Sequence, residues 1–168
     1  ASDVYKRQAL LQLPLVLIEL GSQGAELWSR RQHQGQQSLL EELEQRLHQH
    51  QGLLLTGGAG TGKTTRVRQL LANETARKTL LLAPTGKAAA RLRETLSPLP
   101  ASMHCATLHR AHEANARGGF GRHHDRPLNT DVVVVDEVSM VDTNLMRALL
   151  EALPTSTRLI LVGDSAQL

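Results

Sequence analysis

The chain is poor in aromatic residues and almost free of cysteine. Among its 168 residues, Tyr5, Trp28 and Phe120 are the only aromatic side chains. The core must therefore be aliphatic, and few rings are available to stack on the bases of a nucleic acid. Cys105 is the single cysteine, so an internal disulfide is impossible and nothing suggests a disulfide-stapled secreted scaffold.

The sequence also lacks a long uninterrupted apolar run. Residues 9–20 are mainly apolar, but Gln12, Pro14 and Glu19 interrupt them and the stretch is too short to cross a bilayer. We therefore expect a cytoplasmic protein without membrane contact. A net charge of +3 is compatible with a polyanionic partner but does not identify one. The length suits one domain with a substantial core.

Residues 1–35 are interpreted as a leader followed by a hairpin. The first eight residues fit no periodic pattern and lack a starting Met, which suggests a cloning scar or a cut edge. Two short extended runs, residues 15–20 and 25–30, flank the Gly-rich stretch 21–24. That arrangement is typical of two strands joined by a tight turn.

From residue 36 onward, apolar runs alternate with helical patterns. Continuous apolar runs are typical of strands buried on both faces, and here they occupy residues 53–55, 80–82, 132–135 and 159–162. The spacing of apolar residues predicts helices over 38–50, 63–71, 87–96 and 143–153, the last capped by Asp142. Residues 111–130 show little periodicity and are expected to form a surface loop. The pattern predicts an α/β domain with a mainly parallel sheet flanked by helices.

A glycine-rich loop between the first buried run and a helix carries the clearest chemical signal. Its glycines allow backbone N–H groups to surround a phosphate, and the helix N-terminus adds a positive end. Lys63 is expected to reach the β- and γ-phosphates of ATP, and the Thr64 hydroxyl to bind Mg²⁺. The predicted nucleotide-binding residues are Gly57, Gly58, Ala59, Gly60, Thr61, Gly62, Lys63, Thr64 and Thr65.

Two further strand ends carry polar residues. The run at 132–135 ends in Asp136 and Glu137. Asp136 is expected to hold Mg²⁺, and Glu137 to orient and deprotonate the attacking water. The run at 159–162 leads to Gln167, whose amide can hydrogen-bond the γ-phosphate and report its presence. Taken alone, the acid pair is equally compatible with a solvated acidic turn, and the Gln167 pattern favours a solvated turn over a phosphate sensor.

These residues, in this order, resemble superfamily 1 DNA helicases of the 1B class, and are most similar to the RecD family, the alpha subunits of exodeoxyribonuclease V. Five stretches carry the resemblance. LTGGAGTGKTT at 55–65 matches motif I, APTGKAAARL at 83–92 motif Ia, ATLHR at 106–110 motif Ib, DEVSMVD at 136–142 motif II, and GDSAQL at 163–168 the start of motif III.

The resemblance implies a RecA-like P-loop NTPase fold and a single-stranded DNA track. The residues it assigns to that track are Pro84, Thr85, Gly86, Lys87, Thr107 and His109. The implied activity is ATP-dependent 5′-to-3′ translocation and unwinding in recombinational repair, with two other subunits of a nuclease complex as partners. Contacts to phosphate and sugar would make DNA binding salt-dependent and insensitive to sequence.

The resemblance also implies boundaries. Residues 1–35 correspond to the remnant of an N-terminal domain, and residues 36–168 to motor domain 1, truncated within motif III. Without the second motor domain and its arginine finger, the chain alone is expected not to unwind DNA. Gln34, Gln36 and Gln37 are candidates for reading adenine. Residues 111–112, Ala-His, stand where the family has a more apolar pair.

Other interpretations remain open from the sequence. His104, Cys105, His109 and His112 suggest a zinc cluster, but their spacing fits no closed tetrahedral site. A GTPase is disfavoured because no Asn-Lys-x-Asp guanine reader is present, and a P-loop small-molecule kinase because Thr-Leu-His-Arg at 107–110 stands where its lid and acceptor site would lie. A nucleotide-gated DNA clamp that does not unwind is the alternative function. Arg91 and Arg93 are as compatible with a solvated helix face as with DNA contact.

Overall fold

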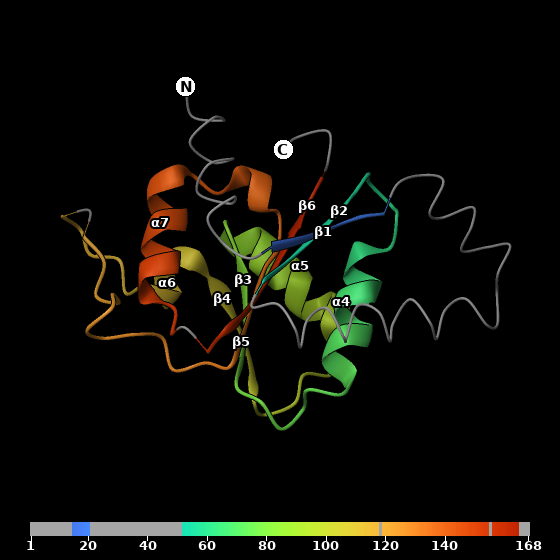
Figure 1. The fold of residues 1–168 in the computed structure, drawn as a ribbon, viewed down its shortest axis with the longest axis horizontal. Coiled ribbons are helices and arrows are strands. Elements are labelled where there is room, and N and C mark those ends of the chain that lie inside the picture. Colours follow the sequence, from blue (N-terminus) through green and yellow to red (C-terminus); the bar gives the residue numbers. More distant parts are fainter. Residues whose placement is uncertain (1–14, 21–51, 118, 155, 165–168) are drawn as a thin grey trace, which may run out of the picture.

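The computed structural model describes residues 15–20, 52–117, 119–154 and 156–164. These residues form a six-stranded sheet in which every strand pairing is parallel, in the order β1-β2-β6-β5-β3-β4 (Figure 1). The strands are β1 Leu15–Leu20, β2 Gly52–Gly57, β3 Thr79–Ala83, β4 Met103–Thr107, β5 Val132–Val135 and β6 Arg158–Gly163. The helices are α4 Lys63–Ala72, α5 Gly86–Leu96, α6 Leu108–Ala111 and α7 Thr143–Ala152, with a 3₁₀ turn η1 at Val138–Met140.

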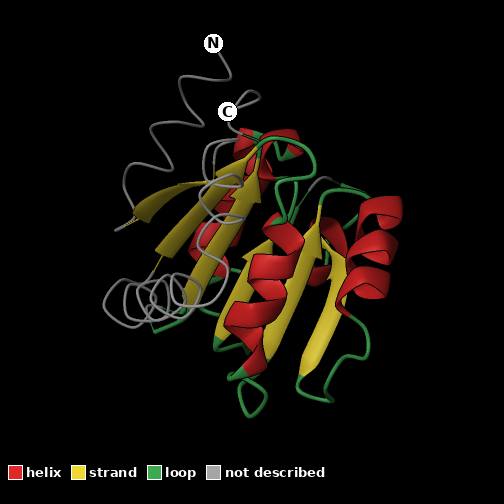
Figure 2. Ribbon diagram, turned by 90° about the vertical axis from the view of Figure 1, so that its right-hand side faces the viewer, coloured by secondary structure: helices red, strands yellow, loops and turns green. Residues whose placement is uncertain are grey.

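Helices cover both faces of the sheet, as Figure 2 shows. Side chains alternate along each strand, so Val132 and Val134 pack in one apolar cluster with α4 and α5. Val133 and Val135 belong to a second cluster, on the opposite face, with α6 and α7. All four valines are completely buried. The prediction of a mainly parallel α/β sheet with strands buried on both faces is confirmed.

The three helices predicted within the described residues begin and end within one residue of the expected positions. The predicted cap of α7 is confirmed, because Asp142 accepts a hydrogen bond from the N–H of Leu145 at 2.9 Å. Thr85, which was not predicted as a cap, accepts one from the N–H of Ala88 at the start of α5, and Gly62 at the start of α4 makes no side-chain cap bond. The apolar stripe of α7 is buried through Leu145 and Leu149. The predicted helix at 38–50 lies outside the described residues. Of the described helices, none is long and apolar enough to span a membrane.

Two elements near β3 were not predicted. Strand β4 and the single turn α6 follow one another, and β4 pairs only with β3 at the edge of the sheet. Only Met103 of β4 is buried. The strand therefore does not need the continuous apolar run by which the other strands were predicted. An edge strand of this kind depends on its neighbour rather than on its own pattern. The expected loop at 111–130 is otherwise irregular, apart from an isolated bridge between His123 and Arg126.

The hairpin prediction stays untested, because only its first strand lies within the described residues. Residues 15–20 do form a strand, but β1 runs parallel to β2, with Leu15 opposite Gly52 and Leu20 opposite Gly57. A hairpin would require an antiparallel neighbour, and the predicted one at 25–30 lies outside the described residues. β1 is thus an edge strand of the main sheet, although the sequence assigned it to the leader. The division at residue 35 remains a prediction.

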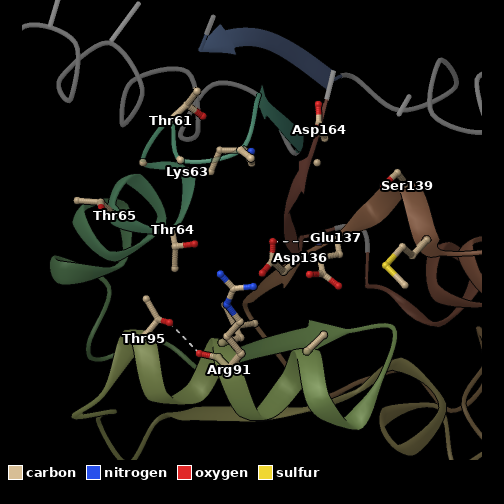
Figure 3. Close-up of a pocket in the computed structure, with 17 residues that line it drawn as sticks. Thr61, Lys63, Thr64, Thr65, Arg91, Thr95, Asp136, Glu137, Ser139 and Asp164 are labelled. Carbon is tan, nitrogen blue, oxygen red and sulfur yellow. Dashed lines mark hydrogen bonds between the residues drawn. The ribbon is translucent and has the colours of Figure 1, made fainter. Parts of the chain in front are cut away.

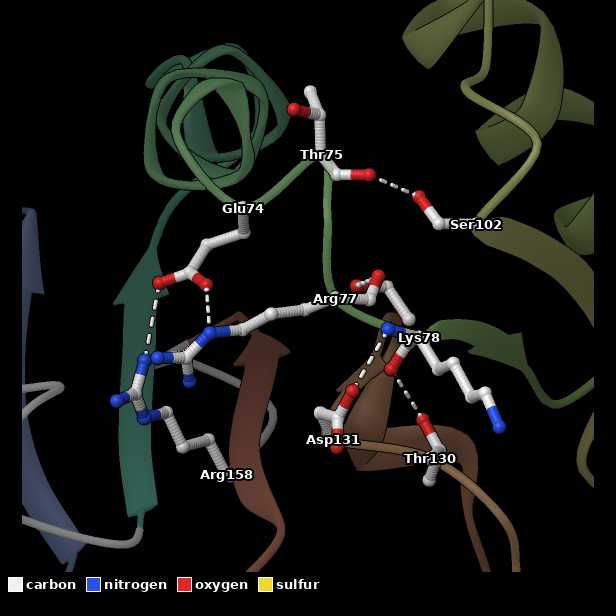
Figure 4. A network of polar contacts seen from close by, with 9 residues as sticks. Glu74, Thr75, Arg77, Lys78, Ser102, Thr130, Asp131 and Arg158 are labelled. Atoms are coloured by element: carbon white, nitrogen blue, oxygen red, sulfur yellow. Dashed lines mark hydrogen bonds and ion pairs between the residues drawn. The ribbon is translucent and has the colours of Figure 1, made fainter.

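Polar contacts tie together the amino ends of the strands (Figure 4). Glu74, which follows α4, forms ion pairs with Arg158 at 3.0 Å and with Arg77 at 2.7 Å. Nearby, the Lys78 N–H donates to Asp131 at 2.9 Å. These groups lie at the edge of the sheet opposite the loops that carry the predicted chemistry.

Candidate nucleotide-binding site

A cavity of about 580 Å³ lies at the carboxyl edge of the sheet (Figure 3). It is bounded by the glycine-rich loop, by one face of α5, by the segment that follows β5 and by the end of β6. Its volume is in the range of small-molecule sites. The residues that line it are Ala59, Gly60, Thr61, Gly62, Lys63, Thr64, Thr65, Ala88, Arg91, Leu92, Thr95, Asp136, Glu137, Ser139, Met140, Gly163 and Asp164.

The glycine-rich loop has the backbone conformation that its sequence predicts. Gly60 and Gly62 have φ of +74° and +82°, which side chains with a Cβ rarely adopt. A Cβ at either position would meet nothing within 4 Å, so conformation rather than space requires glycine. The Nζ of Lys63 donates to the carbonyls of Gly57 and Gly58, the latter at 2.7 Å. This folds the ammonium over the loop at the start of α4.

The two predicted magnesium ligands face the same cavity. Figure 3 shows the Thr64 hydroxyl and the Asp136 carboxylate turned toward the space between the loop and β5. Burial raises the pKa of Asp136. The Asp136 carboxylate accepts a hydrogen bond from the Glu137 N–H at 2.9 Å, and this bond acts to lower the pKa. The charges of Lys63 and Arg91 act in the same lowering direction. A hydroxyl and a partly buried carboxylate are oxygen ligands of the kind that Mg²⁺ prefers. The donor set therefore fits the ion.

Glu137 stands in a strained conformation beside Asp136. Its φ of 50° and ψ of 45° lie in the left-handed region, which a residue other than glycine occupies only at a cost of about 1–3 kcal/mol. The turn ends β5 sharply and precedes η1. It leaves the Glu137 side chain half-buried and lining the cavity, next to the carboxylate of Asp136. Strain of this kind is concentrated at functional sites.

Arg91 lines the cavity, which the sequence did not predict. Ala88, Arg91, Leu92 and Thr95 occupy one face of α5 at helical spacing, and that face is turned to the loop. Arg93 points elsewhere and donates to the carbonyl of Cys105 at 3.2 Å. The helical spacing was readable in the sequence, but which face would meet the loop was not. Ser139, Met140 and Asp164 were likewise missed as lining residues.

The predicted DNA-track residues gather at the ends of two adjacent strands. The segment 84–87 follows β3 and Thr107 ends β4, with Ala83 opposite Thr107 in the register. Lys87 and His109 are exposed. The hydroxyls of Thr85 and Thr107 accept hydrogen bonds from the first turns of α5 and α6, both at 3.2 Å, so each also serves as a helix cap. None of the six residues lines the cavity.

Three other sequence assignments have different outcomes. The histidines and cysteine considered as a zinc cluster do not come together; the group within the described residues that could hold a metal is His123, His124 and Asp125, all exposed. Gln167 and the adenine-reader candidates Gln34, Gln36 and Gln37 lie outside the described residues.

Comparison with known proteins identifies the family. A family model for the AAA domain matches residues 41–168. The chain is 43% identical over 141 residues to the RecBCD enzyme subunit RecD of Mycolicibacterium smegmatis, a match that covers 70% of this chain and 26% of that protein. The Haemophilus influenzae RecD subunit is 40% identical over 137 residues, covering 68% of this chain and 21% of that protein.

A third relative is the ATP-dependent RecD2 DNA helicase of Deinococcus radiodurans, 41% identical over 121 residues, which cover 71% of this chain and 16% of that protein. The chain thus spans about a quarter, or less, of the length of these relatives. The family match includes the glycine-rich loop, the acid pair and the whole lining of the cavity. The chain therefore belongs to the AAA domain family, with a sequence of the RecD-like, superfamily 1 type.

Proposed function

We propose that the chain is the nucleotide-binding half of a RecD-like motor, which hydrolyses ATP to move 5′-to-3′ along single-stranded DNA and unwind it in recombinational repair. The observation that carries the proposal is the cavity in which the loop, Lys63, Thr64 and the acid pair meet. The names of the relatives, a RecBCD subunit and an ATP-dependent DNA helicase, support a DNA motor over other ATPases.

The residues around the cavity divide the work of phosphoryl transfer. The loop N–H groups and Lys63 hold the phosphates, and Thr64 with Asp136 hold Mg²⁺, which when bound neutralises charge on the phosphate oxygens. Glu137 orients a water molecule and accepts its proton. Gln167 follows β6 in the sequence and senses the terminal phosphate. Positioning and charge stabilisation are the main requirements of this reaction, so no further covalent group is needed.

The segment 84–87, Thr107 and His109 form the proposed DNA track. Lys87 lies in the first turn of α5, where its charge adds to the positive end of the helix. The hydroxyls of Thr85 and Thr107 accept from backbone N–H groups and keep their own protons for donation to a phosphate oxygen. Binding through phosphates is insensitive to base sequence, as a translocating motor requires.

The proposal includes the partner subunits and the cellular location. Two further subunits of a repair nuclease are the proposed partners, following the RecBCD name of most of the relatives, while the RecD2 relative is named as a helicase without such a complex. The proposed location is cytoplasmic, because the relatives belong to bacteria, whose DNA lies in the cytoplasm.

Two substitutions test the ATP site. We expect Lys63→Ala to weaken binding of a fluorescent, non-hydrolysable ATP analogue with Mg²⁺ at least tenfold, because a charge-assisted phosphate contact is lost. Glu137→Gln should keep this affinity and lower turnover, in a RecD-like subunit that carries the domain, by about 10²- to 10⁴-fold. Binding is measured by fluorescence anisotropy and turnover by phosphate release.

Arg68→Ala removes a positive charge from the exposed face of the same helix as Lys63 and provides the matched control, with both affinity and turnover unchanged. Turnover at the parental rate in Glu137→Gln would show that Glu137 is not the general base. Parental affinity in Lys63→Ala would show that the nucleotide binds elsewhere. A protein that grips DNA in a nucleotide-dependent way without turnover would be a clamp rather than a motor.

A further inference from the structure

The cavity lining has few positive charges for a site that binds a triphosphate. Of the residues that line it, Lys63 and Arg91 are positive, whereas Asp136, Glu137 and Asp164 are acidic. A triphosphate brings about four more negative charges, and the transfer of its terminal phosphoryl group depends on cations placed around it. The established P-loop pattern uses only one of the two cations. Arg91 is therefore left without a role in the proposed chemistry.

The position of Arg91 is suited to a phosphate. Figure 3 shows its guanidinium rising from α5 toward Thr64 and Asp136, while Lys63 lies across the cavity on the glycine-rich loop. The two cations thus come from different sides. Thr64 and Asp136 are the proposed magnesium ligands and mark the part of the cavity that receives phosphate rather than adenosine. A guanidinium at this place is next to the charged end of the ligand.

The guanidinium of Arg91 has no hydrogen-bond partner within the described part of the chain, although its charge acts on the Asp136 carboxylate. None of the ion pairs formed there includes it, and the one hydrogen bond of this residue that involves a side chain is donated by Thr95 to the Arg91 backbone carbonyl. Its five N–H donors are available in a planar fork that matches two phosphate oxygens. Arg93, two residues along, is occupied by the carbonyl of Cys105. The same helix therefore offers one engaged and one available arginine.

We propose that Arg91 binds the terminal phosphate of the nucleotide, opposite Lys63, so that the domain itself distinguishes ATP from ADP. The inference rests on the proposed ATP site and adds a specificity residue to it. The loop and Lys63 hold the phosphates that both nucleotides share, and Lys63 also reaches the terminal one, whereas Arg91 contacts only the group that ADP lacks. Loss of this phosphate on hydrolysis frees α5, which begins at the proposed DNA track.

Nucleotide affinity tests the proposal directly on the 168-residue chain. We expect Arg91→Ala to weaken binding of a non-hydrolysable ATP analogue by about 10- to 100-fold, the loss typical of a charge-assisted hydrogen bond, and binding of ADP by less than about threefold. Arg91→Lys keeps the charge but not the fork and should recover part of the loss. Arg93→Gln removes the same charge from the same helix outside the cavity and should leave the ATP-to-ADP affinity ratio unchanged.

The outcomes separate this inference from the proposed function. If the parent chain binds both nucleotides and Lys63→Ala loses both, the ATP site stands. In that case, the role of Arg91 alone would be overturned if Arg91→Ala lost affinity equally for the ATP analogue and ADP, or lost none. It would also be overturned if Arg93→Gln showed the same selective loss of affinity for the ATP analogue. If the parent chain binds neither nucleotide, the proposed function and this inference fail together. Isothermal titration calorimetry gives both affinities, and circular dichroism verifies that each variant is folded.

Discussion

At the scale of single residues, His112 is buried completely, and neither of its ring nitrogens has a hydrogen-bond partner among the described residues. The ring packs edge-on against Phe120, with 5.4 Å between centroids. Burial disfavours the charged imidazolium and, with a smaller effect from His109, lowers the pKa of His112 to about 4. An unpaired buried polar group destabilises a fold.

The buried His112 should make the stability of the folded chain sensitive to acid. Below pH 6.5 the unfolded chain protonates His112 while the folded chain does not, until the pH reaches about 4, so acidification through this range destabilises the parent. His112→Leu removes this destabilisation, because leucine takes up no proton. We expect the variant to gain stability relative to the parent as the pH falls from 7 to 5, by on the order of 2 kcal/mol at pH 5.

Urea denaturation of the parent and His112→Leu at pH 7 and pH 5 measures the difference. His109→Leu removes an exposed histidine one turn away on the same segment and serves as the control, with no comparable pH-dependent gain. A constant difference between parent and His112→Leu at the two pH values would mean that the folded and unfolded chains bind protons at His112 equally, so that burial does not lower its pKa.

At the scale of elements, the carboxyl ends and the amino ends of the strands carry different kinds of residues. The carboxyl edge carries the cavity and the strained turn at Glu137, whereas the amino edge is held by ion pairs and hydrogen bonds (Figure 4). Glu74 joins the end of α4 to the start of β6 through Arg158, and both side chains are largely buried, with 9% and 15% exposed. Its second pair, with Arg77, involves a side chain that is 40% exposed.

The two ion pairs of Glu74 should therefore differ in energy. Removing one member of a buried pair leaves the other charge unpaired, so we expect Glu74→Ala to lower the free energy of unfolding by about 3 kcal/mol. Arg77→Ala removes only the exposed pair, worth up to about 1 kcal/mol. Chemical denaturation of both variants tests the ranking. An equal effect of the two substitutions would show that the Glu74–Arg158 pair is screened as if it were on the surface.

At the scale of the whole molecule, the parallel sheet delivers two sets of residues to one edge. Strands β2, β5 and β6 end at the cavity, and the neighbouring strands β3 and β4 end at the proposed DNA track. Helix α5 belongs to both, because its first turn contains Lys87 and its residues Ala88 and Arg91 line the cavity. A rigid helix shared by two sites is a physical route by which one can influence the other.

The DNA track is tested by binding of a single-stranded oligonucleotide to the chain at several salt concentrations. Lys87→Ala should weaken binding for all base sequences and reduce the slope of log affinity against log salt by about 0.7, the value for one phosphate contact to a single strand. Arg93→Ala, with the same loss of charge on the same helix, should leave the slope unchanged. Equal changes in both variants would mean that overall charge, not the track, holds the DNA.

Much of the site was already encoded in short contiguous stretches. The glycine-rich loop, Lys63 and Thr64 need one another within a single turn of chain, so their spacing alone predicts the phosphate cradle. The acid pair Asp136–Glu137 ends an apolar run that can only be a buried strand. Because parallel strands bring their carboxyl ends to one edge, the sequence also indicated that these two stretches meet.

Contacts between distant segments required the three-dimensional structure. The parallel pairing of β1 with β2 depends on a strand far along the chain, and β4 depends on β3, so neither shows in a local pattern. The entry of Arg91 into the cavity and the burial of His112 follow from how helices rest on the sheet. Residue order along a turn or strand is a local property, whereas the face that a helix presents is set by packing of the whole domain.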